Sequence, residues 1–547
     1  MPSFSTVLLP LFTSLSLTTT AAFQTGLPQP HLANPKIIPS TPPTPLKFPI
    51  IGTLPDFLLR GGVDSLSQIY TDMYNEYGSV FSLSLMGSDQ FVLADPRVFD
   101  QVVRSESRYP IGGGEDVATF TQFYDANNLT VAKKGSSRGE DWKEWRSAMD
   151  PDMYKAWESY MPTIAEVARK ISSVAGREVS EAKNIEFVDF LSRAAFDMFT
   201  AVMVGQSLQT TDNSVASPED IEFVKATQAA FDVTGRLLSN PLDKLFGGDL
   251  YSEFNVNMEK TYRFANKMNK EAADQALQLQ QETVTTNDES EGKCPIKGMQ
   301  NAIKTKFSNP SFVERLVHRG QLSNDEIAEI AAPLLMAGVD TTAYVMSWLY
   351  LNLASNPDAQ AKLAAELKSV LNGADLTTKE QMDSLPYLKA CIRESHRLTP
   401  ATVVVVKRLE KDIDIVVPNV DGISRSYHIE AGNRICLNLR GIPMDPKYVT
   451  NPTLFQPERF LPSAIQERKG TPSEIMDHPA FSDPFGRGKR RCLGSNVATA
   501  EIMILAARLF QDWEITLSKD SVKEWKASQK LMLKADPYPS MDVVRRM

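Results

Sequence analysis

Residues Phe485 to Gly494 read FGRGKRRCLG, and an apolar segment with helical spacing follows from about Asn496 to Gln511. A cysteine just before a helix lies at the positive end of the helix dipole, near backbone N–H groups that have no helical partner, so its thiolate form is stabilised. Glycines at 488 and 494 allow the backbone to approach a flat cofactor closely, and Arg490 can reach a carboxylate on its edge. The pattern alone indicates an activated cysteine in a cationic turn, which could be a metal ligand, a nucleophile or a redox thiol.

The composition of the whole chain narrows these choices. Of 547 residues, 42% are hydrophobic and 23% are charged, which is an ordinary globular composition with ample material for a core. The formal net charge is −9 and no basic tract occurs, so the sequence predicts no nucleic-acid partner. None of the four cysteines (Cys294, Cys391, Cys436 and Cys492) lies in a CxxC or other zinc-like spacing. This spacing argues against a disulfide framework and favours a lone reactive or metal-bound thiolate.

Helical patterns dominate the rest of the chain. The helical period prevails from Trp142 to about Gly247, and an apolar run from Ile327 to Leu353 follows a capping box that starts at Ser323. A helix of that length would span about 40 Å, and its acidic residues argue against burial in lipid. Strands are short and do not alternate with helices as they would in a parallel sheet. We therefore predict a single large domain that is mainly α with small β-sheets.

The N-terminal region divides into two parts before this domain. Residues 1–23 include the apolar, Ser/Thr-rich stretch VLLPLFTSLSLTTTAAF, and no charged side chain precedes Lys36. The stretch is too interrupted for a membrane span of about 20 residues, so it is predicted to be a signal-like or targeting leader, with a weak membrane anchor as the alternative. Residues 24–48 are rich in proline and predict a stiff, extended hinge. Residues 49–547 form the predicted domain.

The stretch around Cys492 resembles the haem-binding pattern FxxGxRxCxG of the cytochrome P450 family at every fixed position. Further patterns of that family occur in the expected order: WxxxR at Trp142 to Arg146, AGxDTT at Ala337 to Thr342, ExxR at Glu394 to Arg397, and PERF at Pro457 to Phe460. The resemblance covers the chain from about Pro49 to the end. It implies the cytochrome P450 fold and a haem whose iron is ligated by the Cys492 thiolate.

The resemblance also assigns roles within these motifs. Trp142 and Arg146 lie four apart on one helix face and are expected to hold a haem propionate together with Arg490. Glu394, Arg397 and Arg459 are expected to form a buried structural triad, although an ExxR pair alone would more often be a solvated surface pair. The residues expected to bind the cofactor are Trp142, Arg146, Gly338, Arg408, Phe485, Arg490, Cys492 and Gly494.

The long apolar helix carries the residues that set the expected reaction class. Asp340 and Thr341 correspond to the family's acid–alcohol pair, which relays protons for oxygen activation, and Gly338 removes side-chain bulk beside the oxygen site. The resemblance thus implies a monooxygenase that uses dioxygen to oxidise a mainly hydrophobic small organic substrate. An isomerase or dehydratase acting on hydroperoxides and a non-catalytic haem-binding protein stay open as alternatives. A local bond from the Thr341 hydroxyl to the carbonyl four residues earlier would be its structural role.

The segment from Leu388 to Glu394 resembles the corresponding helix of mitochondrial-type members of the family. In that group, cations at the positions of Lys389 and Arg393 bind an acidic ferredoxin, and their spacing of four could give one exposed cationic face. An ordinary solvated surface is the alternative. Gly112 stands where that group has an arginine, and Ser495-Asn496 replaces a usual Arg-Arg. The electron donor therefore stays open between a ferredoxin and a flavoprotein reductase.

The leader leaves the compartment open. It lacks the arginines of a mitochondrial presequence, whereas TAAFQT resembles the Ala-Phe junction of plastid-targeting leaders in diatoms and related algae. A plastid, a mitochondrion and entry into the endomembrane system are all compatible with it. Peripheral membrane contact is expected if the leader acts as an anchor.

Overall fold

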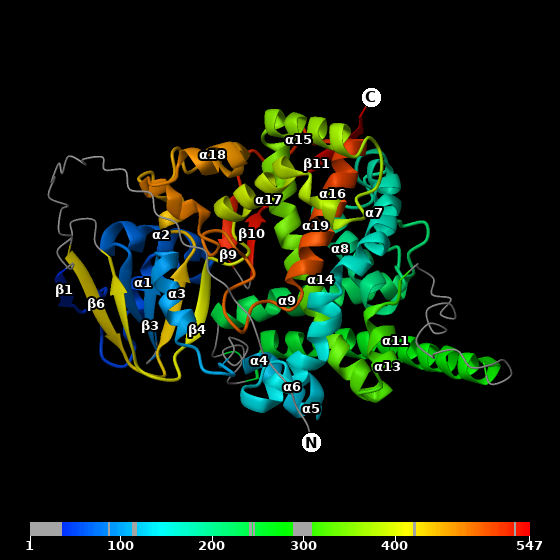
Figure 1. Ribbon diagram of the computed structural model, residues 1–547, viewed down its shortest axis with the longest axis horizontal. Coiled ribbons are helices and arrows are strands. Elements are labelled where there is room, and N and C mark those ends of the chain that lie inside the picture. The colour runs from blue at the N-terminus through cyan, green and yellow to red at the C-terminus, as the bar shows by residue number, and fades with distance from the viewer. Residues whose placement is uncertain are drawn as a thin grey trace, which may run out of the picture.

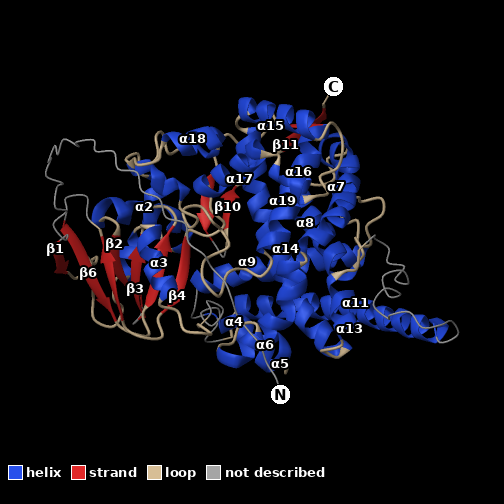
Figure 2. Ribbon diagram, in the orientation of Figure 1, coloured by secondary structure: helices blue, strands red, loops and turns tan. Residues whose placement is uncertain are grey.

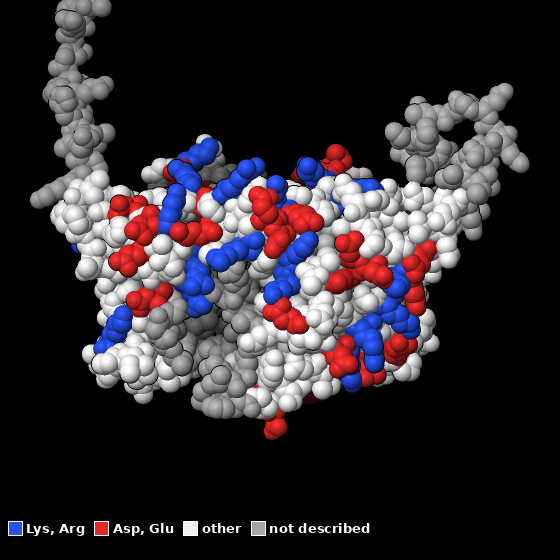
Figure 3. Space-filling model, turned by 90° about the horizontal axis from the view of Figure 1, so that it is seen from below, with Lys and Arg blue, Asp and Glu red and all other residues white. Residues whose placement is uncertain are grey.

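The computed structural model describes residues 36–85, 88–111, 118–239, 243, 247–287, 309–418, 423–529 and 532–546. The leader, the first part of the predicted hinge, Gly112 and Cys294 lie outside the described residues. Figure 1 shows most helices on one side of the molecule and the two larger sheets on the other, together with α1 (Leu54–Leu59), α2 (Leu66–Tyr77) and α3 (Pro96–Arg104). On the face shown in Figure 3, Lys and Arg side chains lie among Asp and Glu side chains.

Helices outweigh strands throughout the described chain, as Figure 2 shows. Those before the central helix are α1 (Leu54–Leu59), α2 (Leu66–Tyr77), α3 (Pro96–Arg104), α4 (Ala118–Ala126), α5 (Thr130–Lys134), α6 (Gly139–Asp150), α7 (Met161–Ala175), α8 (Phe187–Val204), α9 (Pro218–Ser239), α11 (Asp249–Asn287) and α13 (Phe312–Arg319). The central helix is α14 (Asn324–Ala354). It is followed by α15 (Pro357–Val370), α16 (Lys379–Asp383), α17 (Pro386–Leu398), α18 (Pro462–Glu467) and α19 (Ser495–Asp512).

The strands form two larger sheets and two hairpin-like pairs. The four-stranded sheet has the order β2-β3-β7-β4, from Val80–Leu85, Ser88–Leu93, Arg434–Asn438 and Val404–Arg408. The three-stranded sheet has the order β1-β6-β5, from Lys36–Pro39, Ile423–Ile429 and Ile413–Val417. The antiparallel pairs join β9 (Lys526–Gln529) to β10 (Leu533–Asp536) and β8 (Trp513–Leu517) to β11 (Met541–Arg545). The prediction of a mainly α domain with small sheets is confirmed.

Helix α14 begins at the capping box that the sequence predicts. The Ser323 hydroxyl accepts from the N–H of Glu326, and the Glu326 carboxylate accepts from the N–H of Ser323 at 2.9 Å. Pro333 removes one helical hydrogen bond without ending the helix. Among the described residues α14 is the one helix long and apolar enough to cross a membrane. It packs against α8, α11, α17 and α19, so it is the core helix of this domain.

The Pro-rich segment differs from the predicted hinge. Strand β1 pairs in parallel with β6, with Lys36 opposite Ile423 and Pro39 opposite Ser426. The carbonyl of Pro43 accepts a hydrogen bond from the N–H of Ser82 in the other sheet at 2.9 Å. The described part of this segment is extended, as its prolines dictate, but its backbone is bonded to both sheets. The backbone of this segment is therefore joined to the sheets by hydrogen bonds, and the boundary at residue 49 stays a prediction.

Candidate functional site

A cavity of about 520 Å³ lies between helices α6, α8, α14 and α19. One wall is the face of α14 from Leu334 to Val345, whose lining residues are spaced as one helix face requires. Another wall is the loop from Pro484 to Gly494 and the first turns of α19. Cys492 opens into this cavity, and it is exposed whereas Cys391 and Cys436 are buried. Of the described cysteines, Cys492 is the one placed to bind a group in the cavity.

The loop before Cys492 is held in shape by its own backbone. The N–H of Cys492 donates to the carbonyl of Phe485 at 3.0 Å and closes the loop. Gly486 and Gly488 have φ values of 71° and 80°, in the left-handed region that favours glycine. Helix α19 begins directly after Gly494, so its positive N-terminal end lies beside the cysteine.

The electrostatics of Cys492 suit a metal ligand better than a free nucleophile. Cys492 is accessible from the cavity, but the surrounding protein atoms desolvate its thiol and raise its pKa above its ordinary value, while the N–H of Gly494 and the guanidinium groups of Arg146 and Arg491 act in the opposite direction. The thiol therefore stays protonated at neutral pH, where a nucleophile would have to be a thiolate. A metal cation bound to the sulfur would deprotonate it outright.

Cationic side chains gather on the cavity wall near Cys492. The Arg490 guanidinium lies 4.0 Å from the centre of the Trp142 ring and donates to the carbonyls of Pro110 and Ser137 at 2.8 and 2.6 Å. Arg146 donates to Asp150 at 2.7 Å and to the carbonyl of Arg491 at 2.9 Å. Trp142, Arg146, Arg490 and Phe485 all border the cavity, so the structure brings these predicted cofactor-binding residues together.

Three polar atoms that border the same cavity were not singled out from the sequence. The indole nitrogen of Trp145, the hydroxyl of Thr342 and one carboxyl oxygen of Glu501 are buried without a hydrogen-bond partner. Burial also raises the pKa of Glu501 well above its usual range. The sequence could have pointed to each of them. Trp145 lies within the WxxxR motif, Thr342 within the AGxDTT motif, and Glu501 two helical turns after Gly494. Such orphaned atoms are satisfied when a bound group or water fills the cavity.

Asp340 and Thr341 lie at different depths in α14. Thr341 borders the cavity, and its hydroxyl donates to the carbonyl of Ala337 at 2.7 Å. Asp340 is buried behind the cavity wall, its Oδ2 has no hydrogen-bond partner, and burial raises its pKa to about 7. Gly338 borders the cavity, yet a Cβ there would come within 2.5 Å of the Phe199 ring. The close packing of α14 against α8 therefore requires glycine at this position, apart from any need at an oxygen site.

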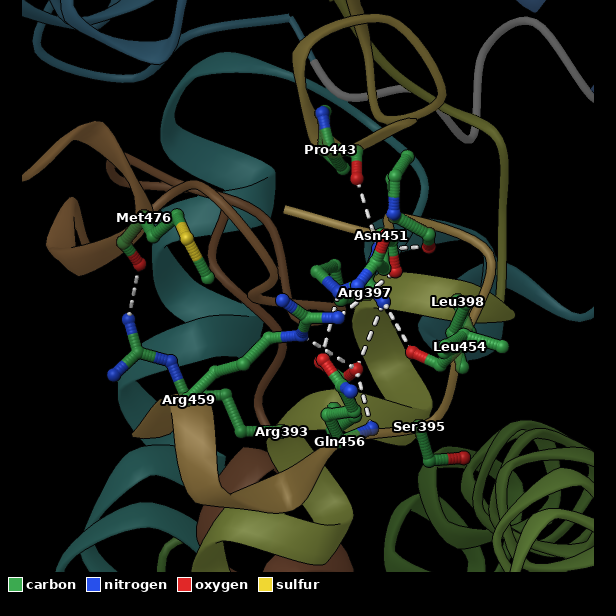
Figure 4. A network of polar contacts seen from close by, with 12 residues as sticks. Arg393, Ser395, Arg397, Leu398, Pro443, Asn451, Leu454, Gln456, Arg459 and Met476 are labelled. Carbon is green, nitrogen blue, oxygen red and sulfur yellow. Dashed lines mark hydrogen bonds and ion pairs between the residues drawn. The ribbon is translucent and has the colours of Figure 1, made fainter. Parts of the chain in front are cut away.

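Figure 4 shows the network of polar contacts around Arg397, with Gln456 and Arg459 beside it. Arg397 donates to both carboxylate oxygens of Glu394 at 2.8 Å and to the carbonyls of Pro443 and Pro452 at 2.9 and 2.7 Å. Arg459 donates from Nε to Glu394 at 3.2 Å. The Glu394–Arg397 pair is fully buried, and such a pair stabilises only when its donors and acceptors are satisfied. The three side chains meet as the sequence predicts, and they tie α17 to the segment that follows β7.

Arg408 lies outside the cavity. It is the exposed last residue of β4 and borders a separate surface pocket with Ile111 and Arg138. Its neighbour Lys407 is buried, because successive side chains of a strand point to opposite faces. Arg408 does not border this cavity, so its contact with the cofactor stays a prediction, and the buried cation of β4 is Lys407.

Lys389 and Arg393 both lie on α17 but have different surroundings. Lys389 is exposed and pairs with Asp383 at 2.5 Å. Arg393 donates to the carbonyl of Met476 at 2.7 Å, and its guanidinium lies 4.4 Å from the centre of the Phe460 ring. Burial lowers the pKa of Arg393. The structure therefore places Lys389 at the surface and turns Arg393 inward, so the two do not form the expected shared cationic face.

The residues around the cavity fit an iron porphyrin. The Cys492 thiol can serve as an axial ligand, and Arg146 and Arg490 can bind the carboxylates on the ring's edge. A Cβ added to Gly494 would project into open space that a flat ring can fill. Among the described residues, no cluster of three or more His, Cys, Asp or Glu side chains could hold a bare metal ion. The fold and the site thus define a haem-thiolate protein.

The particular family follows from comparison with known proteins. The family model described as Cytochrome P450 matches residues 42–540, so the chain belongs to the cytochrome P450 family. It is a haem-thiolate monooxygenase, with the Cys492 thiolate expected on iron.

Relatives at low identity span most of the chain. The 1,25-dihydroxyvitamin D(3) 24-hydroxylase, mitochondrial, of Rattus norvegicus is 23% identical, over 88% of this chain and 85% of the relative. The sterol 26-hydroxylase, mitochondrial, of Homo sapiens is 25% identical, over 87% and 84%. The probable cytochrome P450 12a5, mitochondrial, of Drosophila melanogaster is 24% identical, over 83% and 81%. Two of these relatives are named as hydroxylases, which agrees with a monooxygenase and does not favour a hydroperoxide isomerase.

Proposed function

We propose that Asp340 and Thr341 deliver protons to the reaction centre of this monooxygenase. Bound haem would supply the binding and reductive activation of dioxygen. The observation that supports the proposal is the buried Asp340 carboxyl, which lacks a partner at Oδ2 and whose pKa burial raises to about 7. A group with that pKa both holds and releases a proton near neutral pH. Thr341 places a hydroxyl on the cavity wall one residue further along.

The Thr341 hydroxyl has to move before it can donate into the cavity. Its single proton is committed to the carbonyl of Ala337 at 2.7 Å. A hydroxyl has one donor and two acceptor sites, so in this position Thr341 can accept a hydrogen bond from the cavity but cannot give one. We expect the side chain to rotate about χ1 during turnover, which exchanges the bond to Ala337 for one into the cavity.

Thr341→Ala tests the proposal through product formed per NADPH consumed, measured together with peroxide released. Haem loading should stay at the wild-type level, because the hydroxyl is not a ligand. Coupling should fall strongly, since proton delivery by a positioned group contributes about 10²–10⁴-fold. Thr227→Ala is the matched control, because Thr227 is a buried threonine on α9 with the same kind of bond, at 3.0 Å to Phe223. If Thr341→Ala and Asp340→Asn both keep wild-type coupling, the pair is structural and the proposal fails.

We infer that a ferredoxin-type donor supplies the electrons. Three relatives that span most of the chain are named as mitochondrial proteins, which supports a donor of this type and an organelle location. In this chain Lys379 and Lys389 share one carboxylate, Asp383, at 2.8 and 2.5 Å, and their side-chain contacts lower its pKa to about 2. Glu158 and Glu380 also lie near Lys379, so the docking site rests on the exposed Lys389 ammonium, which an acidic partner can reach.

Lys389→Glu tests this docking site by the rate of haem reduction as a function of ferredoxin concentration. The apparent Michaelis constant should rise, and the difference from wild type should shrink as salt increases, because screening reaches about 8 Å at physiological ionic strength. Substrate binding should not change. Lys260→Glu on α11 is the control, since Lys260 is also exposed and paired with one carboxylate, Glu222. Equal reduction kinetics for both variants would show that Lys389 is an ordinary solvated residue. Reduction by a flavoprotein reductase but not by a ferredoxin would contradict the proposal of a ferredoxin-type donor.

We propose that the substrate is an apolar compound of the sterol or secosteroid class. The support is the set of relatives named for sterol and vitamin D hydroxylation and the apolar side chains that border the cavity, such as Met153, Phe199, Leu334, Val345 and Met532. A mostly apolar wall with few polar groups is typical of a site for such molecules. A titration of the haem spin-state spectrum with sterols, secosteroids and fatty acids tests the class. Binding of fatty acids alone would contradict it.

We also propose that the surface around β1 and α1 rests on a membrane. Ile50, Leu59 and Leu46 are 92%, 89% and 72% exposed, and Phe48, Ile51 and Leu58 are exposed beside them in the sequence. Ile50 has a φ of 67°, a left-handed conformation that is unfavourable for a β-branched residue and costs on the order of 1–3 kcal/mol. A strained turn that presents an isoleucine outward gains stability only if that side chain is buried against another apolar phase.

Cosedimentation of the full chain with phosphatidylcholine–cardiolipin vesicles tests this contact. The double variant Ile50→Ser, Leu59→Ser should bind about 10²–10⁴-fold more weakly, because burying each side chain is worth about 1.5–3 kcal/mol. The control is Val215→Ser with Val256→Ser, two exposed apolar residues elsewhere. Equal binding of the two double variants would assign any membrane contact to the leader alone.

A further inference from the structure

Two buried charged side chains form hydrogen bonds to the backbone of the turn that leads into Cys492. Lys407 of β4 donates from Nζ to the Glu106 carboxylate at 2.5 Å and to the carbonyl of Arg487 at 2.6 Å. The other oxygen of Glu106 accepts from the backbone N–H of Lys489 at 3.1 Å. The side chains of Lys407 and Glu106 are 8% and 7% exposed. An ammonium and a carboxylate from distant parts of the chain thus hold the backbone on both sides of Gly488.

The geometry of Gly488 depends on this pair. Its φ is 80°, and a Cβ at this position would overlap the Glu106 carboxylate. The glycine therefore makes room for the Glu106 carboxylate. Both the turn and the charged pair would have to shift together if either were replaced.

Two further hydrogen bonds join the residues after Glu106 to the residues after Gly488. Lys489 donates from Nζ to the carbonyl of Ser107 at 2.5 Å, and Arg490 donates from Nε to the carbonyl of Pro110 at 2.8 Å. Residues 106–110 therefore run beside residues 487–490, which precede the cysteine. Of these contacts, the Lys407–Glu106 ion pair is the one that is buried and charged on both sides.

We propose that Glu106 and Lys407 are a positioning pair that fixes the loop of Cys492 so that its sulfur meets the haem iron. Burying two charges is costly, and such a pair persists where the charges and the remaining donors and acceptors are satisfied. Here the remaining bonds go to the backbone of the cysteine loop, so any displacement of the loop leaves a buried charge short of a partner. The pair therefore opposes movement of the thiolate away from iron. This inference rests on Cys492 as the axial ligand.

The proposal is tested with Glu106→Gln, Lys407→Met and the double variant in the haem-loaded protein. The readouts are the share of the ferrous carbon monoxide complex with a thiolate-type spectrum and the iron reduction potential. Each single variant should raise the ratio of non-thiolate to thiolate form by roughly tenfold or more, which corresponds to about 1.4 kcal/mol. The double variant should lose less than the sum of the single variants, because it leaves no unpaired buried charge. Lys407→Arg keeps the positive charge, so it should retain most of the thiolate form that Lys407→Met loses.

Asp197→Asn is the matched control for a general loss of stability. Asp197 is a buried carboxylate that holds another loop, through the N–H and hydroxyl groups of Thr210 and Thr211. This variant should lower the unfolding temperature without changing the spectrum or the potential. If Glu106→Gln and Lys407→Met behave in the same way as Asp197→Asn, the pair is merely structural and the proposal is overturned.

Two further measurements keep the outcome decisive. Where a single variant does not fold, Glu106→Asp and Lys407→Gln replace it, and hydrogen exchange of residues 485–494 is compared with wild type in the haem-loaded protein. Faster exchange confined to this loop supports the proposal, and unchanged exchange contradicts it. Cys492→Ser distinguishes the assignment of Cys492 as the iron ligand from the positioning role of Glu106 and Lys407. If that variant keeps the thiolate-type spectrum, the ligand assignment itself fails, whereas its loss together with an unaffected Glu106→Gln protein refutes the positioning role alone.

Discussion

Replacing Asp340 by asparagine should make the protein's stability less sensitive to pH. Burial raises the pKa of Asp340 from 3.8 to about 7 in the folded protein. The unfolded chain releases this proton near pH 4, so between about pH 4 and pH 7 the folded state binds more protons than the unfolded state. The free energy of unfolding therefore falls as pH rises through this window and changes no further above it. An asparagine side chain cannot ionise, so the Asp340→Asn variant should lack this loss.

The size of the effect follows from the shift. About three pKa units correspond to about 4 kcal/mol, since one unit is worth 1.36 kcal/mol. The difference in unfolding free energy between Asp340→Asn and wild type should therefore grow by about this amount between pH 4 and pH 8. Asp340 is fully buried, so solvent screening does not reduce the figure.

Denaturant unfolding of the haem-loaded protein at a series of pH values measures this difference. Asp520→Asn, at an exposed aspartate, is the control and should run parallel to wild type at every pH. Parallel curves for Asp340→Asn as well would refute the reasoning. They would mean that Asp340 is already ionised at low pH and so carries no proton to the site near neutrality.

Other substitutions have equally definite outcomes. Cys492→Ser should abolish the thiolate-type carbon monoxide spectrum, and a retained spectrum would exclude Cys492 as the ligand. Glu394→Gln should leave Arg397 without its buried counter-charge, cost roughly 3–5 kcal/mol and yield little haem-loaded protein, so a fully loaded and stable variant would contradict the structural triad. Gly338→Ala should force its Cβ against the Phe199 ring and cost about 1–3 kcal/mol in thermal unfolding. Phe199→Leu should restore that loss, and no rescue would mean that Gly338 is required for another reason.

Local patterns in the sequence predicted the parts of the site that lie within single elements. The capping box at Ser323 places the start of α14, and the spacing of Glu394 and Arg397 places both on one helix face. The fixed positions around Cys492 place a cysteine at the start of α19. In each case the residues that determine the local structure are close together in the chain, so a single sequence was enough to predict it.

Other predictions depended on contacts between distant segments. A strand alternates its faces, so Lys407 is buried and Arg408 is exposed, and the motif alone did not show on which face Arg408 lies. The spacing of Lys389 and Arg393 is correct for one helix face. However, the Arg393 side chain packs on Phe460 and donates to the carbonyl of Met476, both from later in the chain, so it points away from Lys389. The partner of Glu106 lies 301 residues away and has no local signature.

Strand β1 limits how far the N-terminus can be trimmed. It covers one edge of β6, and the paired strands leave that edge no open row of N–H and C=O groups. A protease that cuts before Lys36 leaves this cover in place. A cut a few residues later removes it and exposes a β-strand edge that can pair with another molecule. The same four residues thus mark the point beyond which a truncation from the N-terminus favours self-association.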